Sequence, residues 1–331
     1  MKTDAPAVMK YRAEALRSIR KFFWKRRYRE VDTPILTPAL IPEAVIDPLE
    51  TVYRDFSGKT VAYALIPSPE IWMKRLLALG SGDIFQLARS FRNSETSSGL
   101  HSPEFTMLEW YTVNAGYLDS LRLQEELCEY LRRKLKAGRV VRVRGKRLEL
   151  KPPFHRVTMQ QAFFEYGRIE LDRLGEFEAL REAAGRFAVE ATPLDDWESL
   201  FHKLFLQEIE PRLPMDRPLF LLDYPVQIPT LAKKKSAGPF VERWELYAAG
   251  IELANCFTEE RDPKRIREFF EHEDAVNRAQ GRSVRTDWEL AEILAKDLPP
   301  CSGNALGVDR LLMVLAGLDS IAPIQLFPFQ Q

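Results

Sequence analysis

The stretch Phe91–Tyr111, FRNSETSSGLHSPEFTMLEWY, joins an arginine, a small polar middle section and an alternating tail. The middle, SETSSGLHS, is typical of a loop, because small polar residues and glycine favour turns over regular structure. The preceding DIFQLARSF and the following EFTMLEWY are typical of strands. The stretch therefore predicts two strands joined by a polar loop, with Arg92 where the first strand ends.

Side chains along the second strand alternate between its two faces. One face holds Phe105, Met107, Glu109 and Tyr111. A carboxylate and a phenol beside an aromatic ring could bind an amine and stack on a base. The alternative is a core strand with a glutamate at its edge, and the alternation alone does not choose between the two.

Bulk composition excludes several classes of protein. The chain has 331 residues, 45 % of them hydrophobic and 29 % charged, with a formal net charge of +0, so nothing global favours a nucleic-acid or membrane-surface protein. No apolar run reaches the roughly 18 residues of a membrane span, and the N-terminus lacks a signal-peptide core. The three cysteines are far apart without CxxC spacing, which favours a reducing compartment. We expect a cytoplasmic protein.

Helix and strand patterns are interspersed without a regular βαβ period, which favours a mainly antiparallel α+β fold. SPEIWMKRLLAL predicts a helix with Ser68 as N-cap and Pro69 at its first position. Two strand-like runs flank Gly250, and CSGNALGVDRLLMVLAG predicts a strand that runs into a helix. We expect a single domain over residues 1–331, with weaker signals and an insertion at about 140–239.

Two arginines beside flexible turns could grip a polyphosphate from two sides. Arg92 precedes the small-residue loop, and Arg310 opens a helix after GNALGVD. The guanidinium group presents a planar fork that suits phosphate. A surface salt bridge is the alternative for either arginine taken alone.

Three glutamates lie seven residues apart in otherwise apolar runs: Glu245, Glu252 and Glu259. Carboxylates in such strands are costly unless they pair with cations. They could hold Mg²⁺ with ATP phosphates, or an amine, although solvent-facing positions stay equally open. The residues alone thus predict a phosphate- and amine-binding pocket.

These residues together resemble class II aminoacyl-tRNA synthetases, most closely the lysine branch. FRNSETSSGLHSPEFTMLEWY resembles motif 2, GNALGVDRLLM resembles motif 3 with Arg310 as its arginine, and FFWKRRYREVDTPILTP resembles motif 1 with Pro34 as its proline. The resemblance covers nearly the whole chain. It implies an antiparallel sheet flanked by helices, and a homodimer formed through motif 1.

Within this class the sequence is similar to the stand-alone family of elongation factor P–(R)-β-lysine ligases. Motif 1 begins near residue 11, so we expect no anticodon-binding domain. The resemblance implies an enzyme that uses ATP and Mg²⁺ to activate β-lysine, or lysine, and attaches it to a lysine of elongation factor P. Ala305 stands where lysine synthetases usually have glycine, which favours β-lysine.

Residue roles follow from the same resemblance. Arg92 and Arg310 are the catalytic residues, with Phe105 stacking on adenine, Glu245 and Glu252 binding the metal, and Tyr111 with Glu259 holding the ε-ammonium. The implied ATP-binding set is Arg92, Asn93, Ser94, Glu95, His101, Ser102, Phe105, Glu252, Leu253, Gly307 and Arg310. The implied amino-acid-binding set is Ser68, Pro69, Glu70, Glu109, Tyr111, Asn255, Glu259 and Ala305.

Three positions depart from the family pattern, and the loop from Arg92 to His101 is one residue longer than in the ligases. Ser94 occupies the position of the motif 2 glutamate, and we expect Glu95 to take the acidic role. Ser102 replaces asparagine, and Cys256 replaces glycine beside Asn255, where a small buried hydrophobe is the favoured interpretation. Two other hypotheses stay open: a ligase for another amino acid or acceptor, and a non-catalytic regulatory paralogue, against which the set of Arg92, Glu252 and Arg310 argues.

Overall fold

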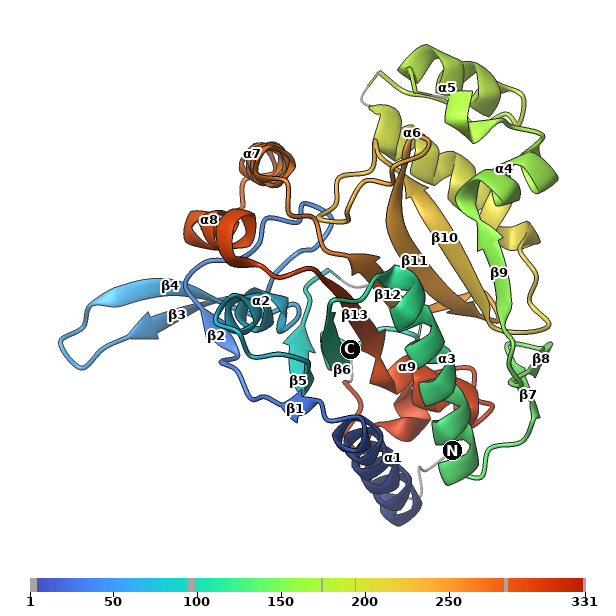
Figure 1. Ribbon diagram of the computed structural model, residues 1–331. Coiled ribbons are helices and arrows are strands. Elements are labelled where there is room, and N and C mark those ends of the chain that lie inside the picture. Colours follow the sequence, from blue (N-terminus) through green and yellow to red (C-terminus); the bar gives the residue numbers. More distant parts are fainter. Residues whose placement is uncertain (1–4, 95–98, 174, 194, 283–284, 330–331) are drawn as a thin grey trace.

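The computed structural model describes residues 5–94, 99–173, 175–193, 195–282 and 285–329. Within this part of the chain an eight-stranded sheet forms the centre of the molecule (Figure 1). Its spatial order is β1 (Arg29–Glu30), β5 (Ile84–Phe91), β6 (Glu104–Val113), β13 (Cys301–Gly307), β12 (Ile251–Thr258), β11 (Phe240–Ala248), β10 (Leu219–Pro225) and β9 (His155–Thr158). The two edge strands pair in parallel and the inner pairs are antiparallel. The predicted α+β fold is confirmed.

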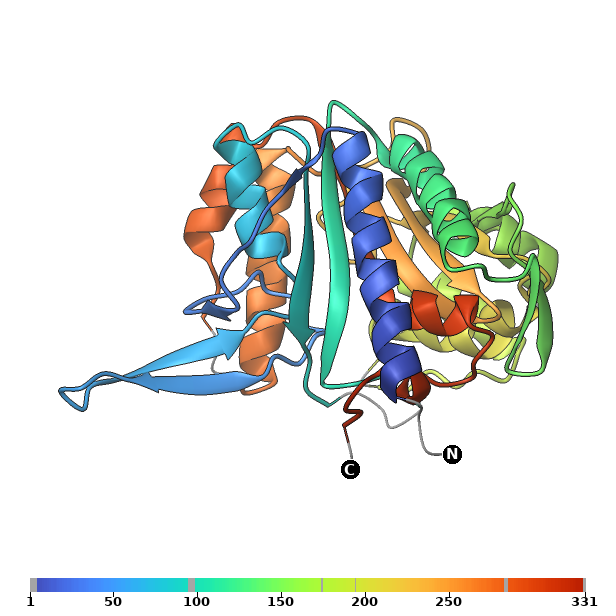
Figure 2. The same cartoon turned by 90° about the horizontal axis from the view of Figure 1, so that it is seen from below.

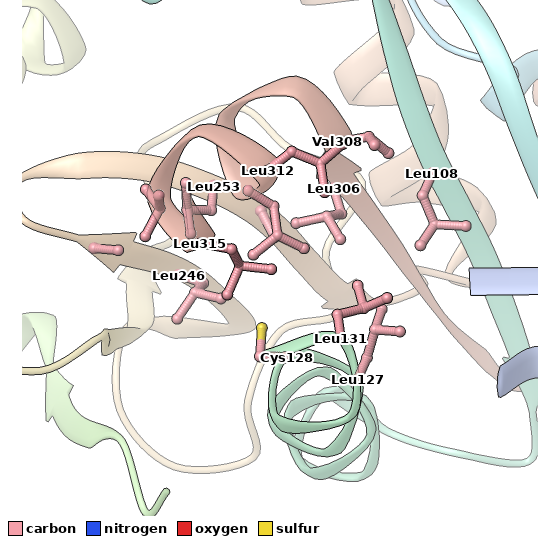
Figure 3. Close-up of a cluster of buried hydrophobic side chains, with 14 of the residues drawn as sticks. Leu108, Leu127, Cys128, Leu131, Leu246, Leu253, Leu306, Val308, Leu312 and Leu315 are labelled. Carbon is pink, nitrogen blue, oxygen red and sulfur yellow. The ribbon is translucent and has the colours of Figure 1, made fainter. Parts of the chain in front are cut away.

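Three helices cover one face of the sheet: α1 (Ala5–Lys25), α3 (Tyr117–Lys134) and α9 (Val308–Leu315), as Figure 2 shows. The helical spacing read in the sequence puts Ile19, Phe22 and Phe23 in this core. Figure 3 shows Leu127 and Leu131 of α3 in the same cluster as Leu312 and Leu315 of α9. Each such buried side chain contributes about 1.5–3 kcal/mol, so this face is a packed core and the site must lie elsewhere.

A second group of helices lies toward the β5 end of the sheet: α2 (Glu70–Ala78), α7 (Pro263–Ala279) and α8 (Trp288–Asp297). Helix α2 begins one residue later than the sequence predicts, with Pro69 as its N-cap residue. Ser68 still serves the helix start, because its Oγ accepts a hydrogen bond from the backbone N–H of Glu70 at 3.3 Å. The first turn of α2 thus presents Ser68 and Glu70 together.

The strands β2 (Leu36–Thr37), β3 (Glu50–Arg54) and β4 (Thr60–Leu65) form a small separate sheet whose β3–β4 hairpin projects from the body (Figure 2). The region predicted as an insertion begins with a hairpin of β7 (Val140–Val143) and β8 (Lys146–Glu149). It continues with α4 (Met159–Gly167), η1 (Leu171–Arg173), α5 (Phe177–Gly185), α6 (Trp197–Leu204), η2 (Phe205–Ile209) and η3 (Glu210–Arg212). These helical segments pack a second apolar cluster against β10 and β11. Because β9 and β10 extend the main sheet, the division of the chain into a domain and an insertion stays a prediction.

A short turn of helix, η4 (Ala322–Ile324), follows α9. None of the helices in the described ranges combines the length and apolar character that crossing a bilayer requires. The three cysteines are free and buried.

Candidate active site

A cavity of about 340 Å³ lies on the sheet face opposite α1, α3 and α9. Phe105, Met107, Glu109 and Tyr111 of β6 line it, whereas Leu108 of the same strand packs in the apolar core. The predicted alternation of β6 is therefore confirmed. The chemistry-bearing face of the strand looks into a cavity of the size that small-molecule sites have.

One end of the cavity is cationic. The guanidinium of Arg92 lies 5.4 Å from the ring centroid of Phe105, and its Nε has no hydrogen-bond partner among the described residues. Arg310 donates from Nε to the carbonyl of Leu100 at 3.1 Å and from NH1 to the carbonyl of Glu252 at 3.0 Å. Both arginines and Phe105 line the cavity, so this end can bind a phosphate chain and stack a base beside it.

The other end is acidic and is built around one buried ammonium. Lys74 Nζ lies 2.6 Å from Glu70 Oε1 and 2.7 Å from Glu259 Oε2, and its side chain is 0 % exposed. Tyr111 donates its hydroxyl to Glu109 Oε1 at 2.7 Å. Two carboxylates therefore share a single internal cation, and a third, that of Glu109, lies near enough for the charge of Lys74 to lower its pKa.

Two carboxylate oxygens at this end are left over. Glu109 Oε2 and Glu259 Oε1 are buried and have no hydrogen-bond partner in the part of the chain that the structure describes. Burial raises the pKa of Glu109 well above its usual value and that of Glu259 to about 7, the negative charge of Glu70 adding to both shifts and Lys74 opposing them. An added ammonium group would lower both pKa values, so the pocket favours a cationic ligand.

Gly303 of β13 leaves the space in which these side chains meet. A Cβ atom at this position would lie 2.5 Å from Tyr111 Cε1 and 2.6 Å from Glu259 Oε1. The Tyr111 ring is 2 % exposed, and the Glu259 carboxylate, although at the end of its side chain, is held through Oε2 by the buried Lys74. Glycine is therefore required here for the ring of Tyr111 and the carboxylate of Glu259 to approach each other.

The predicted metal ligands lie on neighbouring strands between the two ends. Glu245 is fully engaged: its Oε1 accepts from Arg243 NH2 and its Oε2 from the Tyr247 hydroxyl, both at 2.7 Å. Arg243 Nε also donates to Asn255 Oδ1 at 3.1 Å. Glu252 reaches the cavity, and desolvation followed by the charge of Glu245 raises its pKa to about 7.

These carboxylates fit a magnesium ion of the kind that nucleotides carry. No group of three or more candidate ligands occurs in the described residues. Mg²⁺ in nucleotide sites usually takes one or two protein carboxylates, and substrate phosphates and water complete its shell. A cation beside Glu252 would relieve the repulsion from Glu245, so Glu252 suits a direct ligand better than the engaged Glu245.

Sixteen of the residues that the sequence nominated line this one cavity. They are Ser68, Glu70, Arg92, His101, Ser102, Phe105, Glu109, Tyr111, Glu245, Glu252, Leu253, Asn255, Glu259, Ala305, Gly307 and Arg310. Pro69, Asn93 and Ser94 do not line it, and Glu95 lies outside the described residues. Cys256 is 0 % exposed in the core on the opposite face, which confirms it as a small buried hydrophobe.

Ser94 has a structural partner that the sequence did not predict. Its Oγ lies 2.5 Å from Asp47 Oδ2, and the N–H of Asn93 donates to the carbonyl of Asp47 at 2.8 Å. Both bonds tie the end of β5 to the loop at 41–47. A carboxylate therefore lies beside position 94 even though the residue there is serine.

The sequence also left several contributors to the site unnamed. Glu43 lines the cavity from the loop at 41–47, and burial together with Glu70 raises its pKa to about 7. The ring of Phe257 lines the cavity 5.3 Å from Lys74 Nζ. Only Lys74 had a usable signal, because it lies four residues after Glu70 in a predicted helix. Further lining residues are Arg243, Gly303 and Asn304.

Comparison with known proteins defines the class of this site. The family of tRNA synthetases class II (D, K and N) matches residues 1–331, and the chain belongs to that family. Relatives named elongation factor P--(R)-beta-lysine ligase include those of Vibrio atlanticus, 36% identical over 330 residues (97% of this chain, 95% of that protein), and Vibrio cholerae, 36% identical over 338 residues (99% and 97%). The lysine--tRNA ligase of Moorella thermoacetica is 37% identical over 319 residues. That match covers 96% of this chain, which spans only 64% of the Moorella protein.

Proposed function

We propose that this chain is an ATP-dependent ligase that activates (R)-β-lysine, or lysine, as its adenylate and transfers it to a lysine ε-amine of elongation factor P. The proposal rests on the opposite charges at the two ends of the cavity. Arg92 and Arg310 lie at one end, and Glu70, Glu109 and Glu259 lie at the other. This arrangement fits a substrate whose own carboxylate reacts with ATP at the cationic end and whose amino groups pair with the glutamates at the acidic end.

The reaction needs positioning and charge stabilisation, with no covalent bond to the protein. The amino-acid carboxylate attacks the α-phosphorus of ATP, the bond to the β-phosphate breaks, and pyrophosphate leaves. The acceptor amine then attacks the carbonyl of the mixed anhydride, loses a proton, and AMP leaves. Arg92 and Arg310 would stabilise the charge that develops on the α-phosphate during the first step.

The remaining roles are assigned on the same basis. Glu70, Glu109 and Glu259 would pair with the substrate ammonium groups, with Tyr111 and Asn255 beside them. Glu252, with Glu245 behind it, would hold Mg²⁺, which neutralises phosphate charge when it is bound. Phe105 would stack on adenine, close to His101 and Ser102.

Ala305 supports β-lysine as the substrate. In the strand register it lies between Glu109 of β6 and Asn255 of β12, so its methyl group stands between two residues of the amino-acid end. A methyl group there changes the space available to the α and β carbons of the substrate. Such a change alters the binding free energy of one isomer relative to the other by about 1–3 kcal/mol.

Pyrophosphate exchange tests the proposal. The wild-type chain should exchange pyrophosphate into ATP with (R)-β-lysine more efficiently than with lysine, and Ala305→Gly should narrow that preference. Mass spectrometry of elongation factor P after incubation should show one added lysyl mass. Absence of exchange with either lysine isomer would contradict the activation step. If pyrophosphate exchange occurred but the activated amino acid were transferred only to a tRNA, the proposed acceptor, elongation factor P, would be wrong.

A homodimer through motif 1 is part of the proposal. Trp24, Ile35 and Leu36 are large apolar side chains that are 51 %, 41 % and 44 % exposed on the motif 1 stretch, a composition that a subunit interface would bury. Light scattering should give twice the mass of one chain, and Trp24→Glu should shift it toward the monomer. Reduced cysteines fit a cytoplasmic location, which we propose on the same footing.

A further inference from the structure

The chain has no net charge, yet one segment is strongly basic. Between Leu131 and Lys151 the sequence contains ten lysines and arginines and a single carboxylate, Glu149. This segment covers the end of α3 and the whole β7–β8 hairpin, which lies at the rim of the molecule below β9 (Figure 1). The balanced global charge therefore conceals a local concentration of positive charge.

Most of these cations form no ion pair with any residue that the structure describes. Arg132 and Arg133 pair with Glu129, and Glu149 is already paired with Arg217 at 3.1 Å. The eight others are exposed, and their side chains form no ion pair within the described residues. Lys134 lies over the ring of Tyr130, with its Nζ 5.6 Å from the ring centroid. We call the remaining seven the cationic hairpin surface: Lys136, Arg139, Arg142, Arg144, Lys146, Arg147 and Lys151.

The hairpin holds like charges close together. Arg142 lies directly opposite Arg147 in the strand register, and the next pair is Val143 with Lys146. Like charges in such cross-strand pairs repel each other. A bound polyanion would remove that repulsion.

The hairpin is fixed to the body and does not swing freely as a tail. Val143 and Leu148 are 0 % exposed and belong to the main core cluster. The N–H of Arg144 donates to Asp319, and Gly317 packs beside the backbone of Arg142. The cations are therefore displayed on a firm two-stranded support.

The chemistry of the surface favours phosphate groups over a protein partner. Among the hairpin residues Val140 is the large apolar side chain that is exposed, at 41 %, and the hairpin sequence contains no aromatic residue. Protein interfaces are anchored by buried aromatic and apolar side chains. Nucleic-acid backbones are bound by lysine and arginine through charge and counterion release. We infer that the cationic hairpin surface binds the phosphodiester backbone of a nucleic acid, independently of the proposed ligase reaction.

Two matched variants test this inference. The hairpin variant carries Arg142→Gln, Arg144→Gln, Lys146→Gln and Arg147→Gln. The control variant loses the same charge from four exposed cations scattered elsewhere: Lys59→Gln, Arg186→Gln, Lys234→Gln and Lys296→Gln. Fluorescence anisotropy would measure binding of labelled single-stranded RNA, duplex RNA and single-stranded DNA of equal length, at 50 to 200 mM salt. Pyrophosphate exchange and thermal unfolding, each unchanged in the hairpin variant, would show that it is folded.

We expect the hairpin variant to bind at least one of these nucleic acids about tenfold or more weakly, and the control to bind within about twofold of wild type. The slope of log K against log salt should become shallower by up to about 3, at roughly 0.7 for each single-strand phosphate that the variant no longer neutralises. Preference among the three probes would identify RNA or DNA as the source of the backbone. The inference would be overturned if the wild-type protein bound none of the three nucleic acids at 50 mM salt, or if both variants bound them equally weakly. It would also be overturned if polyglutamate displaced the labelled nucleic acid as effectively per charge as unlabelled RNA does.

Discussion

The ammonium of Lys74 lies 2.7 Å from Glu259 Oε2, and both side chains are almost completely buried, at 0 % and 1 % exposure. Glu70 takes a second side of the same ammonium at 2.6 Å. One oxygen of Glu259 is thus committed to an internal cation, while Oε1 is left without a partner among the described residues. The internal pair holds the carboxylate in place for a second cation.

Replacing Lys74 by methionine should destabilise the protein by about 3–5 kcal/mol, because the buried Glu259 and the partly buried Glu70 lose their shared cation. Chemical denaturation with and without a lysine-like ligand would measure it. In the double variant Lys74→Met, Glu259→Gln, part of the loss should be recovered. Lys59→Met, at an exposed position, should change the free energy of unfolding by less than about 0.5 kcal/mol. A Lys74→Met variant as stable as wild type would contradict this account of the pair.

Gly303→Ala should impair amino-acid binding selectively. The added Cβ would contact Tyr111 and Glu259 at 2.5 and 2.6 Å, so these side chains must move apart. We expect the KM for the amino acid to rise about tenfold or more in the pyrophosphate exchange assay, with the KM for ATP within about twofold. Gly185→Ala is the control, since Gly185 lies outside the cavity and an added Cβ there would meet nothing within 4 Å. An unchanged amino-acid KM for Gly303→Ala would show that the close approach has no role in the site.

Amino-acid binding should weaken in acid. The pKa of Glu259 is raised to about 7 by burial, so below that pH the carboxyl group is increasingly neutral and loses its attraction for an ammonium. The KM for the amino acid should rise by up to tenfold per pH unit below about 7. In Glu259→Gln the KM should be high and should change less steeply with pH between pH 6 and 8, since Glu109 still titrates with a raised pKa. A wild-type KM that does not change over this range would argue against an ionised Glu259 in binding.

The same raised pKa affects the stability of the fold in the opposite direction: lowering the pH weakens amino-acid binding but stabilises the folded protein. The folded protein holds more protons on such a carboxyl group than the unfolded chain does between about pH 4.5 and 7. The contribution of this group to the free energy of unfolding is therefore fully present at low pH and falls as the pH rises through 7. Comparing the pH dependence of denaturation of wild type and Glu259→Gln would isolate it.

Arg92→Lys should lower the rate of adenylate formation by about 10²–10³, because an ammonium keeps the charge and loses the planar fork. Single-turnover pyrophosphate release would measure the rate, and thermal unfolding would confirm the fold. Arg89→Lys, on strand β5 just before Arg92, is the control, since Arg89 is exposed and pairs with Glu104 at 3.6 Å. Equal rates for the two variants would remove Arg92 from the catalytic set.

Local patterns and short motifs were enough to predict the family and the mainly antiparallel α+β fold. They also predicted most of the residues that line the cavity. The alternation of β6 assigned its two faces, and the glycine-bearing run before Arg310 marked the junction of β13 with α9. The prediction of Cys256 as a small buried hydrophobe, made from its residue type, belongs to the same group.

Which charges meet became visible only in the folded chain. Segments distant along the chain meet in three contacts: Lys74 with Glu259, Ser94 with Asp47, and Gly303 with Tyr111 and Glu259. The periodicity of a single helix or strand does not predict such contacts. The strand register likewise placed Arg142 opposite Arg147 and left their charges without partners among the described residues. Electrostatic and steric interactions act through space over a few ångströms, whereas sequence patterns report only the faces of single helices and strands.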